Sequence, residues 1–301
     1  SDATRTASLL SGALDATVSV PLQDAQRTNS SGTFPVVQGP ELRTIFLGMD
    51  QKRDELQYSS VKGKNPFKDV RVRKAFYQAI DIEGIKKTVM RGAAVPSATL
   101  IPPQVKGYAA DLATRFPYDV EAAKKLLADA GYGAGFEVKL NCPNDRYVND
   151  GEICQAVAAN LSKIGVKVNL EAETKGTYFP KVLSRNTSFY MLGWTSSTGD
   201  AHNVLYPIMS SPGDGGRGQF NLGAYSNPKV DDLTTKLASE IDQTKRDAMI
   251  GEAIKIHKDD VGHLPLHQQA LSWGSKKSVE VVQYPDNYMP WKFIKVNKAA
   301  K

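Results

Sequence analysis

Two short polar segments of this sequence carry the side chains best suited to orienting a ligand. The candidate binding residues in residues 143–150 are Asn144, Arg146 and Tyr147, alongside Asp145. Those in residues 194–203 are Trp194, Thr195, Ser197, Asp200, His202 and Asn203. Guanidinium, carboxylate, amide and hydroxyl groups fix the position of a polar solute, and tryptophan adds a flat apolar wall with one hydrogen-bond donor. The two segments therefore predict a binding site for a small polar molecule.

The residue types of a serine hydrolase also occur in the second segment, as Ser197, Asp200 and His202. A serine nucleophile needs a base within hydrogen-bond reach and an acid that orients the base. Three such residues within six positions of one loop do not readily reach that geometry, and no Gly-x-Ser-x-Gly elbow is present. A hydrolase is therefore a remote alternative, and no catalytic residue is assigned.

The cysteines and histidines do not predict a metal centre. Cys142 and Cys154 are too few for a four-thiolate zinc site, and they form either one disulfide or two buried thiols. His263 and His267 are four residues apart, but Pro265 between them disfavours the helix that would place both on one face. We interpret the histidines as separate polar or core residues, and we expect no cofactor and no bound metal.

The composition excludes several classes of protein. The 301 residues suggest about two domains, and the 38 basic and 32 acidic residues give a net charge of +6. Residues 276–301 hold six lysines against Glu280 and Asp286, so residues 1–275 carry only +2 and no nucleic-acid surface is expected. The sequence contains no apolar run of about 18 residues, which is the length needed to span a membrane. The start, Ser1 to Arg5, lacks the features of a signal peptide.

The elements that must position the two polar segments are predicted from hydrophobic spacing. Residues 136–142 and 166–172 alternate as strands around an amphipathic helix at 152–164, which predicts parallel strands with a right-handed crossover. Residues 188–194 are typical of a buried strand. If strands 136–142 and 188–194 are parallel neighbours, both polar segments begin at the same edge of the sheet, where open α/β sheets bind ligands. The two segments are therefore expected to face one pocket.

Further elements are predicted along the rest of the chain. We expect helices over 4–14, 70–80, 82–90, 120–130, 178–183, 229–240 and 245–258 and strands over 16–20, 42–47 and 264–273. Asp69, Asp81, Asp119 and Thr244 are the expected caps, and Pro180 is expected in the first turn of its helix. The aromatic segment 283–296 needs another surface to cover it.

The order of several segments resembles the C-terminal part of the family 5 extracytoplasmic solute-binding proteins of ABC importers, the dipeptide- and oligopeptide-binding group. The resembling segments are "NPFKDVRVRKAFYQAID" (65–81), "YDVEAAKKLLADAGY" (118–132), "ANLSKIGVKVNLE" (159–171), "GWTSSTGDAHN" (193–203), "AYSNPKVDDL" (224–233) and "HLPLHQQ" (263–269). The resemblance implies an α/β lobe like that of type II periplasmic binding proteins, with a mixed, largely parallel sheet flanked by helices. Residues 50–268 would form the second lobe, and 1–49 and 269–301 would be remnants of the first lobe and the crossing strands, so a large N-terminal lobe is missing.

The resemblance also implies a function in the periplasm. A monomer would capture a small peptide or related solute between two lobes and deliver it to a membrane permease. Arg146 stands where similar proteins keep the arginine that takes the ligand's carboxylate, whereas Ser197 replaces the aspartate that holds its amine. Asp200 could substitute for that acid. The alternative ligands are non-peptide solutes: an opine, a sugar-like compound or a metal chelate held through His202.

Overall fold

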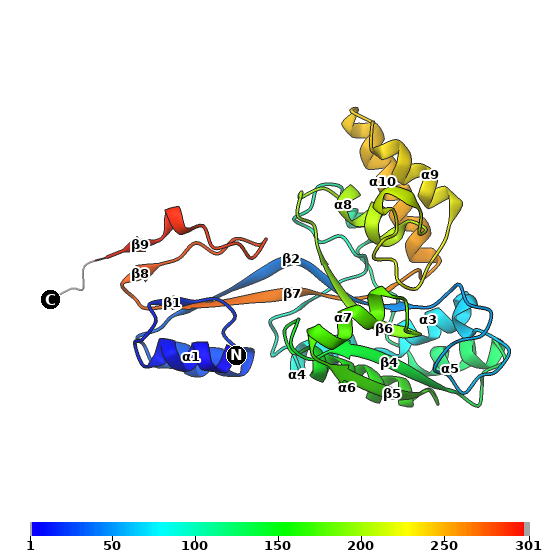
Figure 1. The fold of residues 1–301 in the computed structure, drawn as a ribbon, viewed down its shortest axis with the longest axis horizontal. Helices are drawn as coiled ribbons and strands as arrows, with labels where there is room; N and C mark the ends of the chain where they lie inside the picture. Colours follow the sequence, from blue (N-terminus) through cyan, green and yellow to red (C-terminus); the bar gives the residue numbers. More distant parts are fainter. Residues whose placement is uncertain (1, 298–301) are drawn as a thin grey trace.

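Two long strands join a small part of the molecule to a large part in the computed structural model, which describes residues 2–297 (Figure 1). The strands are β1 (Ala16–Thr17), β2 (Val36–Met49), β3 (Val95–Pro96), β4 (Glu137–Pro143), β5 (Lys167–Glu173), β6 (Phe189–Thr195), β7 (Leu264–Ser275), β8 (Val279–Glu280) and β9 (Lys295–Val296). The helices are α1 (Asp2–Leu10), α2 (Leu22–Ser30), α3 (Val70–Ala79), α4 (Ile82–Thr88), α5 (Val120–Asp129), α6 (Asp150–Ser162), α7 (Lys175–Leu183), α8 (His202–Val204), α9 (Pro228–Leu237) and α10 (Gln243–Asp259). We call residues 2–35 and 276–297 the small part, residues 50–263 the large part, and β2 and β7 the crossing strands.

The main sheet has the strand order β1-β7-β2-β6-β4-β5, and β3 pairs with β7. β4 is parallel to both β5 and β6, which confirms the predicted parallel strands around the helix. β2 is antiparallel to β6 and to β7. The predicted mixed sheet with flanking helices is confirmed. Its parallel part is limited to β5, β4 and β6, because both crossing strands enter the sheet antiparallel to their neighbours.

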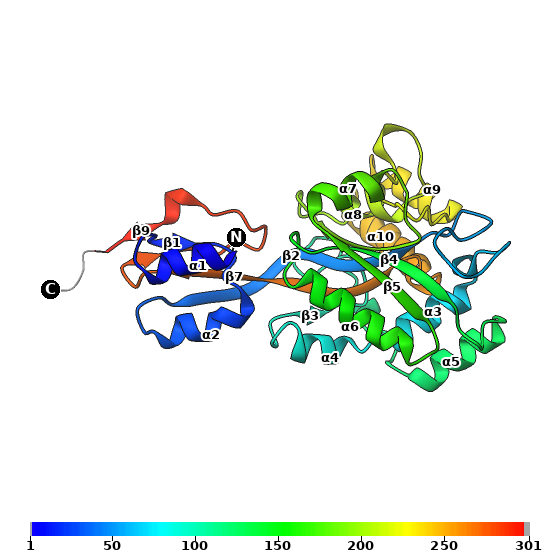
Figure 2. The same ribbon diagram turned by 60° about the horizontal axis from the view of Figure 1, so that its bottom comes forward.

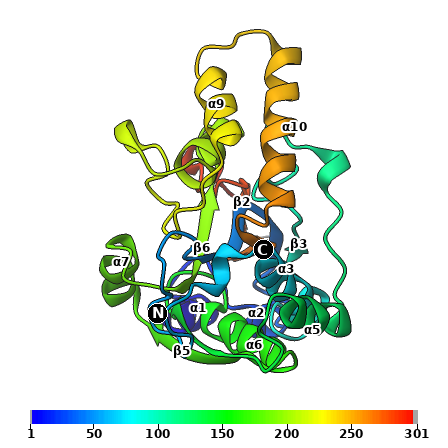
Figure 3. The ribbon, with the colours of Figure 1, turned by 90° about the vertical axis from the view of Figure 1, so that its right-hand side faces the viewer.

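The large part is built on both faces of this sheet, as the alternation within β6 shows. Phe189 and Met191 pack in the apolar core that α3, α4, α5 and α6 cover, and Tyr190 and Leu192 pack in a second core under α7, α9 and α10. Figure 2 shows α6 along β4 and β5, and Figure 3 shows α9 and α10 side by side. β6 is thus buried on both faces, as predicted for an interior strand.

Helix starts in the large part follow acidic caps. The side chains of Asp69, Asp81 and Asp119 accept backbone N–H groups at the starts of α3, α4 and α5, as predicted. The prediction that Thr244 caps the last long helix is wrong. α10 begins earlier, and Asp242 accepts the Lys245 N–H at 3.1 Å.

The start of α7 differs from the prediction. The helix begins at Lys175, so Pro180 lies inside it and not in its first turn. The first turn forms upstream of the proline because the Thr174 carbonyl accepts the N–H groups of Thr177 and Tyr178, both at 2.9 Å. Pro180 then interrupts a helix that has already begun, and removes one internal hydrogen bond.

The small part contains a helix that the sequence did not predict. α2 is polar, and its buried residues Leu22, Ala25 and Thr28 recur every three positions. The C-terminal segment of the same part leaves Tyr288 at 63% and Trp291 at 70% exposure. Within residues 2–297, no helix combines the length and the apolar character needed to cross a bilayer.

Candidate ligand-binding site

The two polar segments meet beside the C-terminal ends of β4 and β6, as predicted. These strands pair only at Leu140 with Phe189 and at Asn141 with Tyr190, and beyond that point they diverge. A pocket of about 330 Å³, the rim pocket, lies here. Its lining includes Arg146, Tyr147, Trp194, Thr195 and Ser197 from the predicted set.

Tyr147 occupies the space where β4 and β6 separate. The Gly193 N–H lies beyond the last paired residues of that ladder and donates to Tyr147 Oη at 2.9 Å. Tyr178 Oη donates to the Met191 carbonyl on the same strand. Burial raises the pKa of the Tyr147 phenol, so the group stays neutral. The tyrosine thus forms a fixed, uncharged floor beside Arg146.

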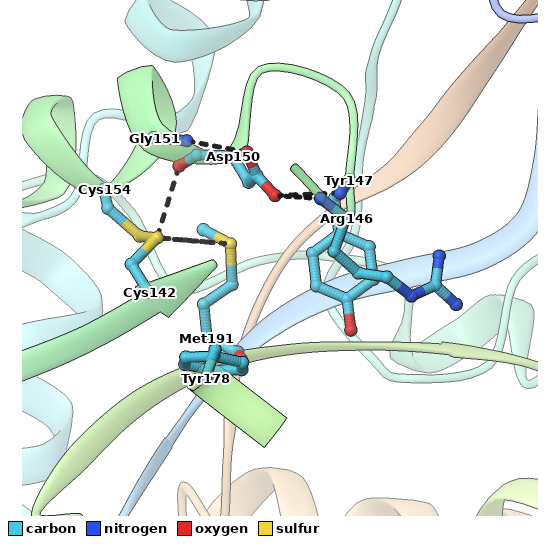
Figure 4. Close-up of a disulfide and its surroundings, with 8 residues drawn as sticks. All are labelled: Cys142, Arg146, Tyr147, Asp150, Gly151, Cys154, Tyr178 and Met191. Carbon is cyan, nitrogen blue, oxygen red and sulfur yellow. Dashed lines mark hydrogen bonds between the residues drawn. A yellow bond between two sulfur atoms is a disulfide. The ribbon is translucent and has the colours of Figure 1, made fainter. Parts of the chain in front are cut away.

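Asp150 shapes the loop that presents Arg146. Its Oδ2 accepts the backbone N–H groups of Arg146 and Tyr147, both at 2.9 Å, and its Oδ1 accepts the Gly151 N–H at 3.0 Å (Figure 4). Burial raises the pKa of the Asp150 carboxyl, although these bonds act in the opposite direction. Both oxygens are engaged with backbone N–H groups, and Asp150 forms no ion pair with the Arg146 side chain among the described residues.

The Arg146 side chain is available to a ligand. Its guanidinium carbon lies 5.1 Å from the centre of the Tyr147 ring. Among the residues that the structure describes, it makes no ion pair with Asp145 or Asp150; Asp145 instead accepts the Lys175 N–H at 2.6 Å. Within residues 2–297, Arg146 is therefore not half of a surface ion pair with either neighbouring acid.

The disulfide left open by the sequence is present. Cys142, at the end of β4, is bonded to Cys154 on α6, and both are fully buried beside Met191 (Figure 4). The bond closes the segment that contains Arg146 and Tyr147. It therefore holds both ends of the loop that forms one wall of the rim pocket.

Trp194 and Phe220 form the apolar wall of the rim pocket, with ring centres 4.9 Å apart. Trp194 Nε1 donates to the Asn203 carbonyl at 2.8 Å, and Asn203 Oδ1 accepts the Ser197 N–H at 3.0 Å. Asn203 is not among the lining residues. It positions the wall through these internal bonds, and its contact with a ligand stays a prediction.

Asp200 and His202 also lie away from the rim pocket. Asp200 pairs with Arg246 at 3.1 Å, and His202 Nε2 lies 3.2 Å from the Thr234 carbonyl oxygen. Among the described residues neither side chain is hydrogen-bonded to Ser197, so these three residues do not form the hydrogen-bonded chain of a hydrolase. Both side chains have partners within the fold, and their contacts with a ligand stay predictions.

The sequence suggested that the histidines are separate residues, but two of the remaining ones lie in contact. His257 Nε2 and His263 Nδ1 lie 2.9 Å apart in the core. His267 is fully buried, and neither of its ring nitrogens has a hydrogen-bond partner in the structure. Residues 2–297 contain no cluster of three or more histidine, cysteine or acidic side chains that could hold a metal ion.

The sequence reasoning missed Arg43, which lines the rim pocket from the crossing strand β2. Residues 42–47 were read only as a strand. The available signal was a charged residue within an apolar strand, since Arg43 stands just before the run Ile45, Phe46 and Leu47.

A larger cavity of about 780 Å³ adjoins the rim pocket and shares Arg43, Arg146 and Tyr147 with it. Asn144, the remaining predicted site residue, lines this larger cavity. Its other walls include residues 19–23 of the small part. The binding residues therefore face a space that lies between the small part and the large part.

The chain is similar in sequence to known solute-binding proteins. Residues 1–216 match the family described as bacterial extracellular solute-binding proteins, family 5 middle. Heme-binding protein A of Haemophilus influenzae is 24% identical over 294 residues, which cover 95% of this chain and 50% of that protein. Glutathione-binding protein GsiB of Salmonella typhimurium is 27% identical over 248 residues, covering 80% of this chain and 46% of that protein.

A similar fold occurs in the dipeptide-binding protein from Pseudoalteromonas sp. SM9913, solved in complex with Met-Leu. The TM-score is 0.83 at 22% identity, and the match covers 99% of this chain and 57% of that one. The present chain thus spans about half the length of the relatives that it matches. At this identity the likeness shows a shared fold, over nearly all of this chain and about half of that protein.

Proposed function

Since the chain belongs to the family 5 bacterial extracellular solute-binding proteins, we propose that it is part of the substrate-binding component of an ABC importer. In this function the protein captures a small peptide or related solute between two lobes and delivers it to a membrane permease. It carries out no reaction, so it needs no catalytic residue. The family's extracellular description agrees with a periplasmic location, where a disulfide is stable.

The rim pocket is the observation that carries this proposal. It combines an Arg146 guanidinium that forms no ion pair within residues 2–297 with the aromatic wall of Trp194 and Phe220. Thr195 also lines the pocket, and its buried Oγ1 has no hydrogen-bond partner among residues 2–297. A few polar groups at an apolar concave site are typical of ligand binding.

We assign the carboxylate of the ligand to Arg146. A charge-assisted hydrogen bond to an arginine contributes about 1.5–3 kcal/mol. Glutathione and Met-Leu, named for two of the similar proteins, are both peptides with a free carboxylate. Ser197 leaves the rim pocket without an acid to pair with an ammonium, so ligands without an amine at this end, including opines and other non-peptide solutes, belong to the same proposal.

The rest of the binding clamp is also part of the proposal. We assign residues 50–268 to the second lobe and residues 1–49 and 269–301 to the first lobe and its connections. The exposed Tyr288, Trp291 and Phe293 support a covering first lobe, because aromatic side chains gathered on a surface mark a contact region. We propose that the full-length protein containing this lobe acts as a monomer.

Thermal unfolding of the full-length protein tests the function. A ligand that binds only the folded state raises the melting temperature, so a pool of dipeptides, glutathione and small carboxylic acids should raise it at millimolar concentration. Arg146→Gln should reduce the shift. Arg27→Gln is the matched control, since Arg27 is 70% exposed on α2 and lies outside both cavities. Absence of any shift with the unmodified protein would refute solute capture.

A further inference from the structure

The crossing strands are irregular at the level of the rim pocket. The register of β2 against β7 shifts between Pro40 and Thr44, so residues 41–43 stand opposite Gln269 alone. Such a bulge bends a strand and redirects the side chains that it carries. The bulge lies where β2 passes from the small part to the large part (Figure 1).

The bulge places Glu41 in the interior and Arg43 at the rim pocket. Glu41 is fully buried, and its carboxylate accepts Arg43 Nε at 3.1 Å and Gln269 Nε2 at 2.5 Å. Arg43 is 14% exposed and lines both the rim pocket and the larger cavity. A buried carboxylate needs such partners, so Glu41 fixes the arginine that stands above it.

The terminal nitrogens of Arg43 remain without a partner among residues 2–297, since its recorded bond to Glu41 uses Nε. Its guanidinium carbon lies 5.8 Å from the centre of the Tyr147 ring, and that of Arg146 lies 5.1 Å from the same point. The two carbons are therefore no more than 10.9 Å apart. They are the only charged groups among the described residues that line the rim pocket.

We propose that Arg43 is a specificity-determining residue that, together with Arg146, makes the rim pocket a subsite for the carboxylate-bearing end of the ligand. This inference rests on the proposed function. One guanidinium comes from the crossing strand and the other from the loop after β4. A carboxylate has two oxygens, each able to accept from a planar guanidinium, whereas a carboxamide replaces one acceptor by a donor. The subsite therefore selects acids over the corresponding amides.

Glu41 and Gln269 are positioning residues in this arrangement. Gln269 Oε1 accepts the Val148 N–H at 2.9 Å, while its Nε2 donates to Glu41. The chain of bonds from Arg43 through Glu41 and Gln269 thus ends on the loop that presents Arg146. Glu41 and Gln269 on the crossing strands therefore help to position both guanidinium groups.

The test compares two ligand pools on the full-length protein by thermal unfolding. One pool contains dipeptides and small carboxylic acids, and the other contains the same compounds with every carboxylate converted to an amide. We expect the unmodified protein to bind the acids about tenfold or more tightly, and Arg43→Gln to reduce this preference by about tenfold. Arg43→Lys keeps the charge and should retain part of the preference.

Arg43→Gln leaves Glu41 buried without its ion pair, so the double variant E41Q/R43Q is measured as well because it removes both charges. E41Q alone should weaken the acid preference through a less ordered Arg43. R27Q should leave it unchanged, since it removes one exposed charge elsewhere. A protein stabilised by neither pool would refute solute capture and this subsite together. A protein that prefers acids equally with and without Arg43 would overturn only the role of Arg43.

Discussion

Reduction of the Cys142–Cys154 disulfide should destabilise the protein by a calculable amount. The two cysteines are 12 residues apart. In the chain-entropy account, freeing a loop of this length in the unfolded state costs about 3 kcal/mol of stability. With about 2.1 cal/mol/K of unfolding entropy per residue, a single transition of 301 residues would then melt about 5 °C lower.

The assay is thermal unfolding of the oxidised chain and of the chain kept reduced, followed by circular dichroism. Reduced wild-type protein is preferable to C142A/C154A, because the alanines also remove two buried sulfur atoms that pack near Met191. The double variant then serves as a control for incomplete reduction and should melt no higher than the reduced chain.

The same change should affect ligand binding more than an equal destabilisation elsewhere. The disulfide closes the segment that carries Arg146, so its reduction loosens one wall of the rim pocket. A reduced chain that melts within about 1 °C of the oxidised chain would refute the entropic reasoning. Unchanged ligand affinity after reduction would show that the hydrogen bonds of the loop, including those to Asp150 and Gln269, hold it without the disulfide.

Three further changes test other contacts. Gly135→Ala should destabilise the fold by about 3 kcal/mol in urea unfolding. Gly135 has a φ of +74°, and an added Cβ would lie 1.8 Å from the Gly165 carbonyl oxygen. An unchanged urea midpoint would contradict this close approach of the two backbones. Burial lowers the pKa of His267 from 6.5 to about 3, so the unfolded state binds its proton first and stability falls as the pH drops below 6.5. By pH 4.5 the loss should reach about 2.5 kcal/mol, and His267→Leu should remove that part of the pH dependence; an identical pH profile would refute it. Asp200→Asn should cost about 1 kcal/mol of stability through its mostly buried pair with Arg246 and leave ligand affinity unchanged; a loss of affinity would support a contact of Asp200 with the ligand.

Local signals in the sequence were sufficient for most of the large part. Asp69, Asp81 and Asp119 each precede an amphipathic run, and a cap depends only on residues within one turn. The parallel arrangement of β4, β5 and β6 followed from alternating strands around one helix, and it brought Arg146 and Trp194 to one edge.

The features that were missed depend on contacts between distant segments. Arg43 reaches the rim pocket through a bulge whose register is set by β7, more than 200 residues later in the chain. Asp200 was a plausible ligand contact until the fold brought Arg246 beside it. Hydrophobic spacing in one strand cannot reveal either partner.

The short ladder between β4 and β6 has a cost and a use. Two strands that stayed paired to their ends would satisfy every backbone group between them and leave no room for Tyr147 or a solute. Here the two strands separate after two residue pairs, and the hydroxyl groups of Tyr147 and Tyr178 form hydrogen bonds with backbone groups of β6 in place of β4. Substitutions that extended the pairing of β4 and β6 would therefore stabilise the sheet but close the rim pocket.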